Sequence, residues 1–358
     1  MPRPPIENLP AELLGKIFVF AVFTSHRYPS ELDRRRANPY NITLVSRYWR
    51  DVAYSTPQLW VILPGQNPRL WERIAKRSGT LPLCLRWHKN APGFQSHPWS
   101  LEIPKDPRFC GRLQGLKCEF GRYNRQLKGL LRTVTPSSSL RHVHMEGEGE
   151  YHLWNDYNEF LTFIQGLPNV TYLGLGRGCI PSIPNSTLST PQIRFGHPNL
   201  RGLYLSESCW KVLRFLAECV PLQTLESLNL EVRCTQGFAE IKRKNRHMVF
   251  RDFWEGRKEA PRSLAVSSSQ SDSSGTTLEI VLGQCQVPGH GSEYGDNTPF
   301  LKCIVTGSGE PAGKAWENLV GVLPLADVEE VTLRNFQLDR EALLLLAPQI
   351  ERIDATDP

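Results

Sequence analysis

The sequence lacks any apolar stretch that could cross a membrane. A spanning helix needs about 18 consecutive apolar residues, whereas the strongest apolar run, Ile17 to Phe23, has seven residues and directly follows Lys16. A secretory signal would need a charge-free apolar segment and a small-residue cleavage site, and the N-terminal residues provide neither. We therefore expect a protein of the cytoplasm, the nucleus or both, without membrane contact.

Motifs typical of catalysis are also missing. The sequence contains no G-x-S-x-G nucleophile elbow, and the adjacent carboxylates of Glu329 and Glu330 would point to opposite faces of a strand. The stretch GSGEPAGK, from Gly307 to Lys314, resembles a phosphate-binding loop, but its glycine spacing is wrong and Ala315 replaces the required Ser or Thr. We expect no catalytic residue and no cofactor.

Histidine and cysteine patterns do not favour a metal site. His142 and His144 alternate along an expected strand with Glu146 nearby, so zinc can be imagined there, but histidines at strand edges more often face solvent. The nine cysteines are an odd number without a C-x-x-C pair, which favours reduced thiols over a disulfide framework. We expect no bound metal.

Charge of one sign is not in large excess. Forty-two Lys and Arg against 36 Asp and Glu give a formal charge of +6, spread too evenly to indicate a nucleic-acid partner. One basic cluster, Lys242 to Lys258, interleaves Phe250, Phe253 and Trp254 and could bind RNA by charge and stacking, or serve as a nuclear-localisation patch. The interpretation we favour is a solvated basic helix with its aromatic side on the core.

Residues 1–80 space their apolar side chains as helices do. A first helix is predicted over 10–22, with a proline at its start, and a polar loop over 24–39. A second helix is predicted over 41–56 and a third over 67–79, each with an asparagine at its N-cap. The sequence therefore predicts a small three-helix unit.

A repeated pattern follows the helices. The motif L-x-x-L-x-L, with other apolar residues allowed, occurs six times, with starts 27, 30, 30, 25 and 103 residues apart. Its last two positions share one face of a strand, while the first lies in the preceding turn. The apolar positions are Leu113, Leu116 and Cys118; Leu140, Val143 and Met145; Val170, Leu173 and Leu175; Leu200, Leu203 and Leu205; Leu225, Leu228 and Leu230; and Val328, Val331 and Leu333.

Such repeats bury their strand faces only by stacking on neighbours. Helical runs lie between them, at 154–164, 210–219 and 340–346. We therefore predict an α/β protein with a three-helix domain (1–80), a linker and first strand (81–110), and an irregular leucine-rich-repeat-like solenoid (111–358).

The chain between the fifth and sixth repeats is less regular. Residues 263–277 are rich in serine with almost no apolar content, which predicts a disordered loop. Leu278, Ile280 and Leu282 then alternate as in a strand, and the stretch from Leu301 to Ile304 is interpreted as a degenerate repeat.

Three cysteines keep a fixed place in the repeats. Cys179, Cys209 and Cys234 each lie nine residues after a repeat start, so they should stack in adjacent repeats. Leucine-rich repeats place Asn or Cys near this turn to satisfy backbone groups, so we expect a buried structural column. A disulfide or a zinc pair is also geometrically conceivable, since neighbouring strands lie about 4.8 Å apart, but nothing supplies further zinc ligands.

The N-terminal residues carry a family resemblance. The block LPAELL (residues 9–14), then Ile17-Phe18, LVSRYWRDVA (44–53) and TPQLW (56–60) resemble the F-box motif in the family's order. The match is most similar to F-box proteins of mushroom-forming fungi, which also carry a stretch like SGTLPL (78–83). It covers about residues 5 to 85, and departs from the family in the long loop from Thr24 to Asn41.

The resemblance implies a non-catalytic subunit of a ubiquitin ligase. Its partner would be a Skp-type adaptor and, through it, a cullin. The physical pattern agrees, because three short helices carry more apolar side chains than so small a unit can hide. Leu14, Val52 and Trp60 are expected to hold the helices together. The matched positions that would contact the adaptor are Leu9, Pro10, Leu13, Ile17, Phe18, Leu44, Val45 and Trp49.

The expected strands suggest where a substrate protein would bind. Residues alternating with the inward leucines face outward, and Tyr and Arg are favoured interface anchors, which selects Tyr172, Tyr204 and Arg334. Binding through the insertion 235–325 or the far loops is the alternative for the site. For the function, the alternatives are a non-degradative interaction scaffold and an RNA-binding repeat protein.

Overall fold

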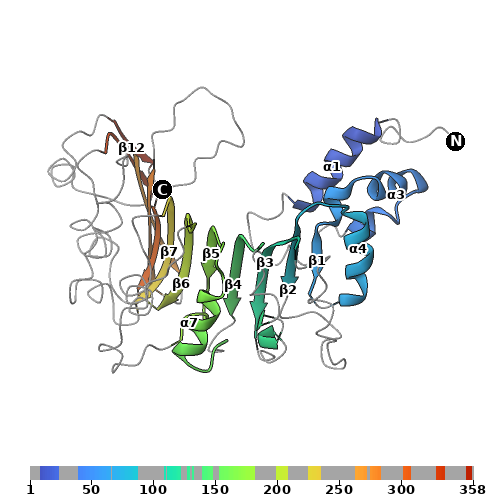
Figure 1. Ribbon diagram of the computed structural model, residues 1–358. Coiled ribbons are helices and arrows are strands. Elements are labelled where there is room, and N and C mark those ends of the chain that lie inside the picture. The colour runs from blue at the N-terminus through green and yellow to red at the C-terminus, as the bar shows by residue number, and fades with distance from the viewer. Residues whose placement is uncertain are drawn as a thin grey trace. The chain divides into compact units, whose positions relative to one another are not determined.

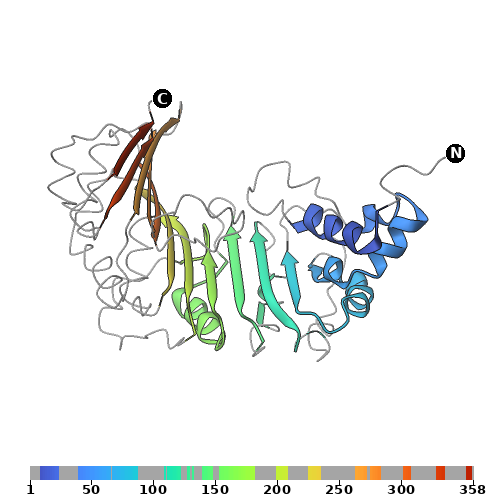
Figure 2. The ribbon, with the colours of Figure 1, turned by 90° about the horizontal axis from the view of Figure 1, so that it is seen from above.

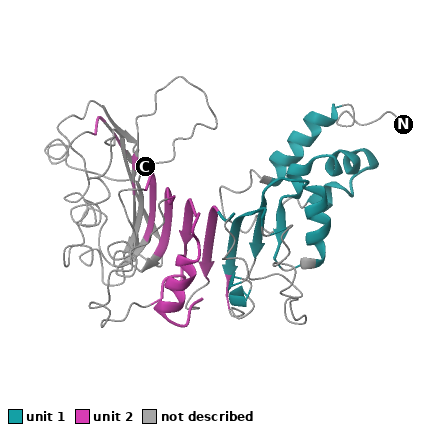
Figure 3. Ribbon diagram, viewed as in Figure 1, with its two compact units in different colours: residues 1–119, 125–140 teal, residues 120–124, 141–358 magenta. Residues whose placement is uncertain are grey.

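A computed structural model of the chain shows an α/β protein with N-terminal helices followed by parallel strands (Figure 1). It describes residues 9–23, 39–65, 67–87, 109, 111–121, 127–129, 131–132, 139–147, 153–181, 199–208, 225–234, 263–271, 275–283, 301–307, 328–334 and 352–356. Two compact units divide the chain: unit 1 holds residues 1–119 and 125–140, and unit 2 holds residues 120–124 and 141–358 (Figure 3).

Unit 1 begins with a cluster of short helices. They are α1 (Ala11–Phe23), α2 (Pro39–Ile42), α3 (Arg47–Tyr54), the 3-10 turns η4 (Pro57–Trp60) and η5 (Pro68–Leu70), and α4 (Trp71–Arg77). The predicted first and third helices are confirmed, the third as η5 followed by α4. Gly79 adopts a φ of 59° after α4, the left-handed conformation that favours glycine at a helix end. The polar loop predicted over 24–39 lies almost wholly outside the described residues.

The predicted second helix is wrong as a single element. The chain forms α2, a turn over residues 43–45, and then α3. Ser46 explains the break, because its backbone is extended and its Oγ accepts a hydrogen bond from the Trp49 backbone N–H at 3.2 Å. A serine that satisfies an orphan amide in this way starts a helix rather than continuing one. Leu44 and Val45 consequently lie in a turn, not on a helix face.

Aromatic side chains fill the centre of the helical cluster. Trp60 is buried and donates its indole N–H to the Ala53 carbonyl oxygen at 2.8 Å. The Arg77 guanidinium from α4 lies 4.4 Å from the Trp60 ring centroid and 4.0 Å from that of Tyr54. Cation–π contacts at such distances are stabilising, so Arg77 joins α4 to α3 and η4.

Three parallel strands complete unit 1. Strand β1 (Ile62–Pro64) pairs with β2 (Leu83–Trp87), and β2 pairs with β3 (Leu113–Phe120). Helix α4 makes the connection between β1 and β2 and contacts β1, as a parallel crossover requires. The helices of the predicted three-helix domain therefore share one compact unit with these strands.

Arg112, directly before β3, ties the strands of unit 1 to the end of α4. Its guanidinium donates to the carbonyl oxygens of Leu81 (2.8 and 3.0 Å) and Ala75 (3.2 Å) and to Ser78 Oγ (2.7 Å). Ser78 is fully buried. Carbonyl groups at the end of a helix lack intrahelical donors, so Arg112 supplies a donor to the Ala75 carbonyl of α4 and joins it to Ser78 and Leu81 just beyond the helix.

Replacing Arg112 with Met should lower the free energy of unfolding of unit 1 by about 2 kcal/mol, because hydrogen bonds to charged groups are lost while the aliphatic stem remains. Thermal unfolding followed by tryptophan fluorescence would measure the change. Arg69→Met, at an exposed position of η5, is the matched control and should stay within about 0.5 kcal/mol of wild type. Equal effects of the two substitutions would contradict the assigned role of Arg112.

Unit 2 opens with four parallel strands in one register. They are β4 (His142–Gly147), β5 (Tyr172–Leu175), β6 (Gly202–Ser208) and β7 (Ser227–Cys234). The second apolar position of each repeat aligns across all four strands, and so does the third. These rows are Val143, Leu173, Leu203 and Leu228, and then Met145, Leu175, Leu205 and Leu230; all eight side chains are buried.

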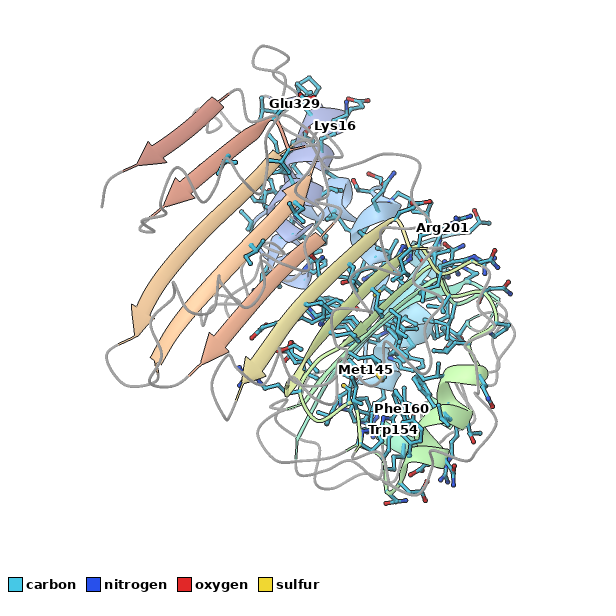
Figure 4. The ribbon with its side chains drawn as sticks, turned by 90° about the vertical axis from the view of Figure 1, so that its left-hand side faces the viewer. Lys16, Met145, Trp154, Phe160, Arg201 and Glu329 are labelled. Atoms are coloured by element: carbon cyan, nitrogen blue, oxygen red, sulfur yellow. The ribbon has the colours of Figure 1, made fainter. Side chains whose placement is uncertain are left out.

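Helix α7 (Tyr157–Gln165) connects β4 to β5 and confirms the helix predicted over 154–164. Asp156 caps it, accepting the Glu159 backbone N–H at 2.8 Å. Its buried residues include Phe160 and Ile164, and Trp154 just before it is buried as well. Figure 4 labels Met145 of β4, Phe160 of α7 and Trp154 just before α7. The other two predicted helices, 210–219 and 340–346, lie outside the described residues.

The rest of unit 2 departs from a simple repeat array (Figure 2). Strand β10 (Leu301–Gly307) lies parallel to β7, but β9 (Gly275–Gly283) runs antiparallel to both β10 and β8 (Ser263–Ser271). Strands β11 (Glu330–Arg334) and β12 (Arg352–Thr356) then continue parallel to β8.

The disordered loop predicted over 263–277 is therefore corrected. Composition alone favoured disorder, whereas Leu264 and Val266 pair in register with Leu282 and Ile280 of β9. Backbone hydrogen bonds between the two strands do not depend on the serine side chains, so long-range pairing overrides local polarity.

The cysteine column is confirmed at the one position that the structure fully describes. Cys179 is buried, and its thiol donates to the Met145 carbonyl oxygen at 3.2 Å, so it satisfies a backbone group at a repeat turn. Cys209 lies outside the described residues, and Cys234 ends β7 with its side chain not described. Cys118 of β3 is also a buried free thiol, and burial raises its pKa well above the ordinary range.

Cys118 and Cys179 should therefore resist maleimide in the folded protein, because a buried thiol gives little thiolate. Peptide mass spectrometry after brief labelling would find both unmodified in native buffer and both modified in denaturant. Labelling at equal rates in the two conditions, or a disulfide or zinc ion on Cys179, would contradict the structural role.

Candidate binding surfaces

Besides Tyr54 of α3, which is 40% exposed, five large apolar side chains among the described residues of unit 1 face solvent. Leu13, Ile17 and Phe20 are 48%, 47% and 58% exposed and follow one stripe of α1. Leu44 and Val45, in the turn between α2 and α3, are 76% and 60% exposed. These five residues are called the helical apolar surface below. Among the described residues no other helix or turn exposes so many large apolar groups.

Contacts between α1 and α3 hold this surface in place. The Tyr48 hydroxyl donates to the Leu9 carbonyl oxygen at 2.7 Å, which joins α3 to the start of α1. Phe18 packs against Trp49 with ring centroids 4.9 Å apart. The Arg50 Nε atom donates to the Thr43 carbonyl oxygen at 3.0 Å and so fixes the turn that presents Leu44 and Val45.

The residues that match adaptor-contact positions of the motif differ in how far their side chains are exposed to solvent. Leu13, Ile17, Leu44 and Val45 are exposed, and so is Pro10, while Leu9 and Trp49 are half-buried. Phe18 is buried and belongs to the interior of the cluster. Sequence reasoning did not select Phe20, although its spacing of seven residues from Leu13 places it on the same stripe.

The three residues expected to hold the helices together behave as predicted. Leu14, Val52 and Trp60 are 0%, 3% and 1% exposed. The sequence therefore distinguished interior from exterior positions correctly at these three places.

A second candidate surface lies on the strands of unit 2, on the face opposite the leucine rows. Alternation along each strand brings His144, Gly174, Tyr204 and Asn229 into one row across β4 to β7. Glu146 and Glu231 follow two residues later on β4 and β7, and Arg177 follows β5. His144, Glu146, Arg177, Tyr204, Asn229 and Glu231 are called the strand-face cluster below.

Gly174 allows two rings of this cluster to meet. The strands β4 and β6 are two spacings apart, about 9.6 Å, yet the His144 and Tyr204 rings stack with centroids at 5.5 Å and an interplanar angle of 28°. Gly174 lies between them, and any β-carbon there would collide with the imidazole of His144. Absence of a side chain on the middle strand thus creates the aromatic pair.

Tyr204 also joins the charged members of the cluster. Its hydroxyl donates to Glu231 Oε2 at 3.0 Å, and Glu231 Oε1 lies 3.9 Å from the Arg177 guanidinium. At the other ring, His144 Nε2 lies 3.9 Å from Glu146 Oε2. Burial, and then the nearby Glu231 carboxylate, raise the pKa of Tyr204 well above its ordinary value, so the phenol stays protonated.

The predicted substrate anchors fall partly within this surface. Tyr172 and Tyr204 are both half-buried on neighbouring strands, and the Tyr172 ring covers Gly202, where a β-carbon would lie 2.8 Å from Cδ2. Arg334 ends β11, and its side chain is not described. The structure therefore places the two tyrosines on the same face of neighbouring strands, and the side chain of Arg334 is not described.

The remaining sequence features give no site within the described residues. No group of three or more His, Cys, Asp or Glu side chains there could hold a metal ion. Partial burial lowers the pKa of His142 from its ordinary value. In the part of the chain that is described, no helix is both long and apolar enough to cross a bilayer. The basic cluster Lys242 to Lys258 and nearly all of the GSGEPAGK stretch lie outside that part.

Comparison with known proteins adds no family to this picture. No protein-family model matches the chain, and no curated protein matches it significantly.

The raised pKa of Tyr204 predicts how stability depends on pH. Above pH 10, the ordinary tyrosine pKa, an unfolded Tyr204 ionises while the folded one keeps its proton, so the free energy of unfolding should fall as the pH rises. Tyr204→Phe should make this fall shallower, which urea unfolding at a series of pH values from about 9 to 11 would measure. Parallel curves for the two proteins would contradict the assigned environment of the phenol.

Proposed function

We propose that the protein is an F-box substrate receptor of a Skp-cullin-F-box ubiquitin ligase. Unit 1 docks on a Skp-type adaptor through the helical apolar surface, and unit 2 captures a protein through its strands. The chain performs no chemistry itself, because ubiquitin transfer would belong to other subunits.

The exposure of the helical apolar surface is the observation that carries this proposal. Leu44 is 76% exposed and Phe20 is 58% exposed, on a unit whose other described large apolar groups are buried or half-buried apart from Tyr54. Clustered apolar exposure of this kind is typical of a surface that a partner covers, since it costs solubility otherwise. Four of the five residues also match contact positions of the F-box motif, namely Leu13, Ile17, Leu44 and Val45.

The interior of unit 1 supports the same proposal. An adaptor-binding surface has to keep its shape when the rest of the chain binds a substrate. Arg112 and Ser78 join the helices to the strands of the same unit by hydrogen bonds at 2.7 to 3.2 Å. The docking helices and the first strands thus form one packed body, rather than a helical module on a loose tether.

Replacing Leu13, Ile17, Leu44 and Val45 together with Ala should abolish co-purification of the adaptor. These side chains are about half or more exposed, so their truncation removes the centre of the interface but little of the core. Affinity purification of the tagged full chain, followed by mass spectrometry for adaptor and cullin peptides, is the measurement. The melting temperature of the variant should stay close to that of wild type.

Leu14→Ala is the matched control on the opposite side of α1. Leu14 is fully buried, so its truncation should lower the free energy of unfolding by about 3 kcal/mol and reduce adaptor binding only through loss of folded protein. Undiminished adaptor recovery by the fourfold variant would overturn the docking assignment. Absence of adaptor and cullin from the wild-type purification would instead support the scaffold alternative.

A further inference from the structure

We propose that Arg50 is a positioning residue for adaptor docking, which keeps Leu44 and Val45 directed outward by fixing the turn that carries them. The inference deepens the proposed function and rests on it. Arg50 acts through the Thr43 carbonyl oxygen, to which its Nε atom donates at 3.0 Å, rather than through contact with the partner.

The turn between α2 and α3 joins two buried residues to two exposed ones. Ile42 and Thr43 are buried, whereas Leu44 and Val45, directly after them, are the most exposed large apolar residues that the structure describes. Removing a large apolar side chain from water is favourable, so a turn that was free to move would fold these side chains against the helices. Their exposure therefore requires contacts that hold the backbone of the turn in place.

Hydrogen bonds to α2 fix one side of this turn. The Leu44 backbone N–H donates to the Asn41 carbonyl oxygen at 3.1 Å. The Thr43 hydroxyl donates to the Tyr40 carbonyl oxygen at 2.7 Å. These bonds all run back toward α2, so they do not by themselves fix the turn relative to α3.

Arg50 supplies the bond to α3. Its Nε atom reaches back seven residues to the Thr43 carbonyl oxygen. Its backbone N–H donates to the Ser46 carbonyl oxygen at 3.1 Å, within the first turn of α3. A guanidinium is planar and its donors keep fixed directions, so this contact sets the orientation of the peptide group between Thr43 and Leu44.

Helix α3 also supports the other half of the helical apolar surface. The Tyr48 hydroxyl donates to the Leu9 carbonyl oxygen just before α1, and Trp49 packs on Phe18 of α1. One helix therefore fixes both the stripe on α1 and the turn, so a partner meets them as one preformed surface. Preorganisation of this kind raises affinity, because less conformational freedom is lost on binding.

Two other roles for Arg50 lead to different expectations. Arg50 is exposed, so one alternative is that its charge contacts an acidic group of the partner. The other is that its hydrogen bond stabilises the fold and has no bearing on docking. Substitutions that separate the donor from the charge distinguish these roles from positioning.

Arg50→Gln and Arg50→Met form a matched pair for the test. Both remove the charge and both keep a side chain that reaches about as far as the Nε atom, but only glutamine retains an N–H donor there. Each full-length variant is titrated with the purified Skp-type adaptor by biolayer interferometry. We expect Arg50→Met to weaken binding about tenfold and Arg50→Gln to weaken it less than about twofold. Equal losses in the two variants, or wild-type binding by Arg50→Met, would overturn the inference.

A double-mutant cycle gives a readout that a loss of fold stability would not produce. In a Leu44→Ala, Val45→Ala background the turn has no large side chain left to present, so adding Arg50→Met should weaken binding less than about twofold further. The stripe on α1 is intact in this background and keeps the remaining affinity measurable. A further loss of about tenfold would mean that Arg50 acts by another route and would overturn its positioning role.

Arg47→Met is the control for general effects of charge, because Arg47 is exposed on the same helix. It should bind the adaptor as wild type does, and a loss equal to that of Arg50→Met would overturn the inference. A wild-type chain that binds no adaptor would overturn the proposed function together with this inference. Normal wild-type binding without a difference between Arg50→Met and Arg50→Gln would overturn the inference alone.

Discussion

The fold of unit 2 depends on one constraint. Its parallel strands pair in one register, and the side chains along each strand alternate between the two faces of the sheet. Val143, Leu173, Leu203 and Leu228 lie in one row because their strands pair without an offset. A slip of one residue would expose that whole row and bury the polar one. The same backbone pairing that closes the core therefore also lines up His144, Gly174, Tyr204 and Asn229, so core and candidate site are two faces of a single arrangement.

Much of the fold followed from local sequence signals, and the errors show where such signals fail. The repeat positions predicted the strands β3 to β7 and β11, because apolar spacing reflects burial directly. The second helix was predicted as continuous because its apolar period runs through Ser46, whose side chain instead caps a new helix. Strand β8 was missed because its pairing with β9 is a contact between chain segments, which the composition of one segment does not reveal.

The candidate surfaces were predictable to a smaller degree. Alternation with the leucines selected Tyr172 and Tyr204, and the motif order selected Leu13, Ile17, Leu44 and Val45. The contact between rings on β4 and β6 depends on side-chain conformations and on what a neighbouring strand lacks. This property belongs to no single residue, so periodicity cannot reveal it.

Gly174 and Gly202 have a consequence for how the surface can change. Each occupies an outward position on a strand whose inward residues are already fixed by the core, so a substitution there would displace a ring of the adjacent strand and leave the leucine rows untouched. Alanine or serine at Gly174 would push the His144 ring aside and break its stacking on Tyr204. The outward face can thus change its arrangement of side chains one residue at a time while the buried core stays unaltered.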